Sequence, residues 1–152
     1  MTNNTNYELK TSEVSENEVK QLAGNLQDTM IYIAPESSSS ELDLLNHYSA
    51  DMKKLAAQYN IPCQIIRHGS SYKYLDLKDA DIVLPFLISL SASACYDILK
   101  YFITKYFLQD SNKLKVKIIT KSGKSFKYER KEISGKPEGV LKALELLKNE
   151  EA

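Results

Sequence analysis

Residues 81–108 read DIVLPFLISLSASACYDILKYFITKYFL, a stretch that is apolar around most of a helical surface. Its few polar residues lie three or four positions apart, as on one side of an α-helix; they are Ser89, Ser93, Asp97, Lys100 and Thr104. The residue before a proline avoids the helical conformation, so we predict that one long helix begins at Pro85 and runs to Leu108. A helix with so wide an apolar surface is buried on several sides.

A chain of 152 residues forms one domain with a limited core. We expect that one flanking sheet and a few short helices leave part of the helix 85–108 uncovered. A second subunit or a partner protein would then cover the rest. The residues expected at this interface are Leu87, Leu90, Ala94, Ile98, Tyr101 and Phe102.

Shorter elements are predicted before this helix. Ser15 and Glu18 have the spacing of a capping box and predict a short helix. Residues 30–34 (MIYIA) are typical of a short apolar strand. Ser40 is a good N-cap for a helix that continues to Tyr59.

Two hairpins and a final helix complete the predicted elements. Residues 63–68 and 72–77 flank a glycine turn and are expected to pair. Residues 114–120 and 125–130 alternate apolar with charged side chains on either side of a second turn. Pro137 is typical of the first position of a helix.

The order of these elements predicts an α+β fold, in which a small mixed or antiparallel sheet of hairpins packs on a long central apolar helix and shorter helices. Residues 15–148 are expected to form a single domain. Residues 1–14 are expected to be a loosely ordered acidic segment, with a possible short strand at residues 7–10.

Charge and composition exclude few classes of function. The chain has 20 basic and 20 acidic residues, so its net charge gives no argument for nucleic acid or an anionic membrane. The N-terminus lacks the apolar core of a secretory signal, which makes a cytoplasmic location the expectation. The uncharged run in residues 82–96 is shorter than the ~20 residues of a membrane-spanning helix, so no span is expected.

No motif predicts a cofactor, a metal or a catalytic centre. Lys121–Ser125 resembles the end of a phosphate-binding loop, but Ile118 occupies the first glycine position and a strand follows where a helix is needed. The histidines and cysteines lack the spacing of metal ligands. An enzyme with a site near His68 and residues 76–81 is the last of three interpretations. Asp97 is expected to pair with Lys100 on the same helix or to fix the register of two subunits.

The hairpin 113–131 is locally basic and supports an alternative function, nucleic-acid binding. A solvated strand face that prevents edge-to-edge pairing explains the same lysines, and we favour it. The residues expected to contact nucleic acid in the alternative are Lys113, Lys115, Lys117, Lys124, Lys127 and Arg130.

Residues 79–147 resemble a known family in the order of their elements. The apolar segment LISLSASACYDILKYF is followed by the strands KLKVKIITKSGK and SFKYERKEI and by the short helix PEGVLKALELL. This order resembles the effector-associated constant component domains of prokaryotic conflict systems, which are thought to be non-enzymatic modules encoded beside defence effectors. The resemblance implies an accessory component of a bacterial defence system. It implies no functional residues, because that family has no catalytic motif.

The sequence therefore predicts a non-enzymatic interaction or adaptor module. It is expected to bind itself or a partner protein through the apolar helix 85–108.

Overall fold

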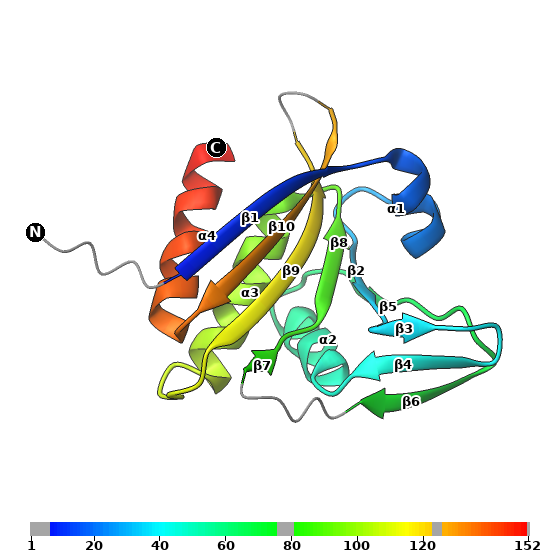
Figure 1. The fold of residues 1–152 in the computed structure, drawn as a ribbon, viewed down its shortest axis with the longest axis horizontal. Coiled ribbons are helices and arrows are strands. Elements are labelled where there is room, and N and C mark those ends of the chain that lie inside the picture. Colours follow the sequence, from blue (N-terminus) through cyan, green and yellow to red (C-terminus); the bar gives the residue numbers. More distant parts are fainter. Residues whose placement is uncertain (1–6, 76–80, 123–125, 152) are drawn as a thin grey trace, which may run out of the picture.

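The computed structural model describes residues 7–75, 81–122 and 126–151, and it has the predicted α+β architecture (Figure 1). The helices are α1 (Glu16–Ala23), α2 (Ser49–Gln58), α3 (Ala92–Tyr106) and α4 (Pro137–Glu151). The strands are β1 (Tyr7–Val14), β2 (Ile31–Ala34), β3 (Ser37–Ser38), β4 (Leu42–Asn46), β5 (Cys63–Ile65), β6 (Ser71–Leu75), β7 (Ile82–Val83), β8 (Phe86–Ser89), β9 (Leu114–Lys121) and β10 (Tyr128–Gly135). No described helix has the length and apolar character needed to cross a membrane.

Seven strands form one large mixed sheet in the order β1-β10-β9-β8-β2-β5, with β7 also paired to β9. The β9–β10 hairpin is the one predicted from the sequence, although its second strand begins at Tyr128, which pairs with Lys121. The segment expected to be loosely ordered is instead an edge strand from Tyr7 onward, since β1 pairs with β10 over eight residues. Residues 1–6 lie outside the described chain.

The prediction of one helix over residues 85–108 is wrong in its first part. Residues 86–89 form β8, a central strand between β9 and β2, and α3 begins only after the N-cap Ser91, which accepts a hydrogen bond from the amide of Ala94. All four residues of β8 are buried. A strand buried on both faces has no apolar–polar alternation, so its sequence cannot be distinguished from that of a buried helix.

Pro85 lies between β7 and β8, where the pairing with β9 is interrupted. Ile82 pairs with Leu114, and Leu87 pairs with Ile118, so the segment containing Pro85 has one residue more than the facing segment of β9. Proline has no N–H to donate to a sheet and is tolerated at such an irregularity.

The apolar surface of α3 is covered by the chain itself. Cys95, Ile98, Leu99, Phe102 and Ile103 are buried in a core that α2, α3 and α4 form with one face of the large sheet (Figure 1). The prediction that the chain leaves part of the apolar surface of this helix uncovered is therefore wrong. The cause is that the sheet has seven strands and that two further helices flank α3.

Helix α1 packs on the opposite face of the large sheet, at one end. Ser15 is its N-cap and accepts a hydrogen bond from the amide of Glu18, which confirms the predicted helix start. Val19 of this helix is buried against Tyr32, Ile88 and Ile119 of the sheet. The core under α1 is smaller than the core around α3. In the described chain no helix covers the rest of this face of the sheet.

A separate small sheet has the order β3-β4-β6. The predicted helix 40–59 is wrong over its first part, because residues 42–46 are strand β4 and α2 begins at Ser49. The predicted hairpin of residues 63–68 with 72–77 is also wrong. β5 pairs with β2 in the large sheet, whereas β6 runs parallel to β4. These pairings join segments distant in sequence, which local turn signals do not reveal.

Candidate binding site on the open sheet face

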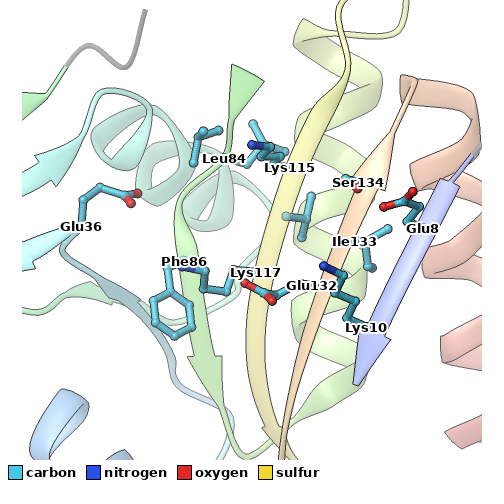
Figure 2. A pocket seen from close by; sticks show the side chains of 12 residues that line it. Glu8, Lys10, Glu36, Leu84, Phe86, Lys115, Lys117, Glu132, Ile133 and Ser134 are labelled. Atoms are coloured by element: carbon cyan, nitrogen blue, oxygen red, sulfur yellow. The ribbon is translucent and has the colours of Figure 1, made fainter. Parts of the chain in front are cut away.

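The helix-free part of the large sheet presents charged side chains from three neighbouring strands. Side chains alternate between the faces of a strand, and Lys10, Glu132 and Lys117 share one face, because Lys10 pairs with Glu132 and Glu132 with Lys117. Glu8 and Ser134 extend the same row, as Figure 2 shows.

These side chains border a depression of about 390 Å³. Its apolar lining includes Leu84 and Phe86, beside the interruption between β7 and β8 (Figure 2). Val83 also lines it, as do Val116 and Ile133. Its charged residues include Glu36, which lies across from the strands of the hairpin (Figure 2).

Several of the charges around the depression already have partners. Lys115 forms an ion pair with Asp81 at 3.6 Å, and the guanidinium of Arg130 lies 3.7 Å from Glu132. A carboxylate oxygen of Glu36 accepts a hydrogen bond of 2.9 Å from the side-chain amide of Asn46. Of these contacts, the one with Arg130 offsets the charge of a carboxylate that borders the depression.

The ammonium groups of Lys10 and Lys117 differ from their neighbours. Within the described chain neither forms an ion pair with a carboxylate. Lys117 Nζ lies 5.3 Å from the centroid of the Phe86 ring, and the Arg130 guanidinium carbon lies 5.7 Å from it. A cation in this position is attracted by the ring face. The depression is therefore bordered by two ammonium groups without a carboxylate partner in the described chain, one of which, Lys117, lies beside Phe86.

The residues predicted to contact nucleic acid are only partly brought together. Lys115, Lys117 and Arg130 lie on or beside the open face. Lys127 forms an ion pair of 3.3 Å with Glu13, Lys113 precedes β9, and Lys124 lies outside the described residues. Carboxylates alternate with the lysines across the strands, so the face is not uniformly basic.

The residues predicted to form the helix interface do not form one surface. Leu87 lies on β8, not on the helix, and Leu90 follows that strand. Ile98 and Phe102 are buried in the core of the chain, and Ala94 and Tyr101 are half-buried. The ring of Tyr101 stacks on Tyr59 of the same chain with centroids 4.0 Å apart.

Asp43 is the centre of a second polar cluster, one that the sequence analysis did not find. Its carboxylate is fully buried in the small sheet. It accepts hydrogen bonds from Ser38 Oγ at 2.6 Å, from the amides of His68 and Gly69 at 3.0 and 2.8 Å, and from Arg67 Nε at 3.1 Å. Burial alone would raise the pKa of Asp43, but these donors outweigh it and lower the pKa from 3.8 to about 2.

The Asp43 cluster has a structural role. All its donors come from the β3 strand and the loop before β6, so the carboxylate joins the segments on either side of β4. The ring of His68 points elsewhere, with Nε2 2.9 Å from the carbonyl oxygen of Leu22. The expected site near His68 and residues 76–81 falls partly outside the described chain.

The remaining candidate groups are also placed in structural positions. Burial raises the pKa of the Cys63 thiol to about 12, with a nearby Lys53 opposing the shift, and Cys95 is fully buried. No group of three or more metal-ligating side chains occurs among the described residues. Asp97 pairs with Lys148 of α4, and the predicted pairing with Lys100 is replaced by this contact between helices.

Comparisons of the chain with protein-family models, with curated proteins and with solved structures found no match. Function is therefore inferred from the residues of the chain itself.

Proposed function

We propose that this chain is a non-enzymatic interaction module that binds an acidic segment of a partner protein in the depression of the open sheet face. The observation that supports this is the pair of ammonium groups of Lys10 and Lys117. They lack carboxylate partners in the described chain and border the same depression, where Lys117 lies beside the ring of Phe86. A peptide carboxylate against one of these lysines, with an apolar neighbour on Phe86, would use both features of the site.

The surrounding carboxylates favour a peptide over nucleic acid. Glu8, Glu36 and Glu132 border the same depression. A nucleic-acid backbone brings a row of closely spaced phosphates, and these would approach the three carboxylates as well as the lysines. A peptide can place a single acidic side chain against Lys10 or Lys117, on the side away from Glu132, and keep neutral groups near the glutamates.

An adaptor role agrees with the resemblance of residues 79–147 to the effector-associated constant component domains. Those modules are thought to act beside effectors without catalysis. Accordingly, we propose an accessory role in a bacterial defence system as the cellular setting of this binding activity. An effector gene beside the gene for this chain would support the setting, and a neighbourhood without defence genes would count against it.

Titration of the labelled protein with two peptides and one oligonucleotide tests the binding proposal by NMR. The probes are a short glutamate- and leucine-containing peptide, the matching peptide with lysine in place of glutamate, and a single-stranded oligothymidylate of equal charge. We expect the acidic peptide alone to shift the amide signals around Lys10, Phe86 and Lys117. Binding of the oligonucleotide without binding of the acidic peptide would overturn the proposal.

The double variant Lys10→Ala/Lys117→Ala assigns the binding to this site. Exposed ion pairs contribute about 0.2–1 kcal/mol each, so the affinity for the acidic peptide should fall about two- to thirtyfold. Lys53→Ala/Lys54→Ala on α2 is the matched control, because it removes two exposed lysines away from the depression. Equal losses in both variants would show a response to net charge only, which contradicts a site on the open face.

A further inference from the structure

Strand β1 is the longest edge strand of the described chain. It pairs with β10 along one side, and no described strand lies along its other side (Figure 1). The opposite edge of the large sheet is β5, which has three residues. A long open edge is a template for pairing with another strand.

The backbone groups that point outward from β1 can be assigned from the neighbouring strands. The carbonyls of Lys113 and Lys115 accept hydrogen bonds from Ile82 and Leu84, so residues 113 and 115 of the β9 segment face β7. Successive residues face opposite edges, and the even-numbered residues of β9 therefore face β10. Each even-numbered residue of β9 pairs with an odd-numbered residue of β10, so the even-numbered residues of β10 face β1 and pair with its even-numbered residues. The odd-numbered residues Leu9, Thr11 and Glu13 of β1 therefore point outward.

We propose that two copies of this chain pair through antiparallel β1 strands, with Leu9 opposite Leu9 on a two-fold axis. In this register the outward backbone groups of Leu9 and Thr11 meet outward groups of the second copy. Glu8 of each copy lies opposite Lys10 of the other, at positions where side chains of facing strands come closest. The two large sheets become continuous across the dimer.

Charge selects this register over its neighbours. A shift by one residue along each strand places Lys10 opposite Lys10, and directly opposed like charges destabilise a strand pair. A further shift places Leu9 opposite Glu13. The register centred on Leu9 is the one that forms two opposite-charge pairs and one apolar pair.

Exposed apolar surface at the same residue supports the pairing. Leu9 is 40% exposed, on the face of the sheet that α4 covers, since its partner Ile133 is part of the core with that helix. Pairing of Leu9 with its copy would cover this side chain. The pairing does not rest on peptide binding, but it uses Glu8 and Lys10 of the depression, so Glu8 of the second copy would compete with an acidic peptide for Lys10.

Sedimentation equilibrium on a charge-reversal series tests the pairing. We expect the wild type to dimerise, and Lys10→Glu and Glu8→Lys each to weaken the dimer about ten- to hundredfold, because both pairs become repulsive. The double variant Glu8→Lys/Lys10→Glu should restore the dimer. Lys54→Glu on α2 is the control for charge alone and should leave the dimer unchanged.

Thr11→Pro provides a second variant that does not depend on charge. It removes an outward N–H and leaves the inward hydrogen bonds to β10, so the fold should persist by circular dichroism while the dimer is lost. Its affinity for the acidic peptide should remain, which separates failure of the dimer from failure of the binding site. A wild type that stays monomeric at high micromolar concentration, or a dimer unaffected by Lys10→Glu and Thr11→Pro, would overturn the proposal.

Discussion

The backbone amide of Gly69 donates a hydrogen bond of 2.8 Å to the buried carboxylate of Asp43. This contact also depends on the absence of a side chain at Gly69, because a Cβ there would lie 2.7 Å from the backbone nitrogen of Leu42. The loop after β5 can therefore approach β4 closely enough for the amides of residues 68 and 69 to reach the carboxylate. One buried charge thus fixes how the small sheet meets the chain around it.

Asp43→Asn should destabilise the protein by about 2–4 kcal/mol. An amide offers one acceptor oxygen where the carboxylate offers two, and its NH₂ group would face donors that include Arg67 Nε. Buried donors left without acceptors are costly, and hydrogen bonds to a charged group are among the stronger ones. Urea unfolding followed by circular dichroism measures the change. Asp51→Asn, at an exposed position in α2, is the control and should change stability little.

The lowered pKa of Asp43 predicts a specific acid sensitivity. Because the folded pKa is about 2 and the ordinary value is 3.8, the unfolded chain binds this proton more readily than the folded chain does. The contribution to stability, on the order of 1–2 kcal/mol, is complete above about pH 5 and is lost as the pH falls through about 2. The difference in unfolding free energy between wild type and Asp43→Asn should therefore shrink across this interval. A difference that stays constant from pH 5 to 2 would show that the charge is not responsible.

Elements with strong local signals could be predicted from the sequence. The start of α1 at Ser15, the β9–β10 hairpin and the start of α4 at Pro137 each depend on residues close together in the chain. Each of these signals acts within a few residues: a capping side chain, an alternating pair of strands and a helix-initiating proline. The local sequence is therefore sufficient to predict these elements.

The central strand β8 could not be predicted, because its environment decides its conformation. Phe86–Ser89 is apolar and continues directly into the residues that form α3. Only the presence of β9 and β2 on either side makes it a strand. The pairing of β1 with β10 and of β4 with β6 likewise depends on distant segments.

The candidate sites were missed for the same reason. Lys10 and Lys117 are more than a hundred residues apart and meet on the open face only because β10 lies between their strands. The predicted helix that begins after Ser40 puts Asp43 in its first turn, where a carboxylate is common. The alternation of Leu42, Asp43 and Leu44 is typical of a strand, but it would turn Asp43 towards solvent, whereas the structure buries Asp43 and Leu45 on the same face.

Phe102→Ala tests whether α3 belongs to the core or to an interface. Phe102 is 1% exposed and packs against other core residues of the same chain. Truncation should lower the free energy of unfolding by about 3–5 kcal/mol. Leu108→Ala, which alters a side chain that is 39% exposed, should cost less than about 1 kcal/mol. If Phe102→Ala kept full stability and only changed the oligomeric state, the side chain would lie at an interface and its placement in the core would be wrong.

The thiols of Cys63 and Cys95 should both react slowly in the folded protein. The thiolate is the reactive species, and burial raises the pKa of Cys63 to about 12, so its thiolate fraction at pH 8 is about a thousandfold below that of an ordinary thiol with a pKa of 9.0. Cys95 is fully buried in α3 and should react only after the helix is exposed. The rate of modification by a disulfide reagent, measured with and without denaturant, should rise by about two to three orders of magnitude on unfolding. Cys63→Ser identifies which thiol reacts first. Rapid reaction of Cys63 in the folded state would mean that the strand β5 edge opens readily, and it would contradict the raised pKa.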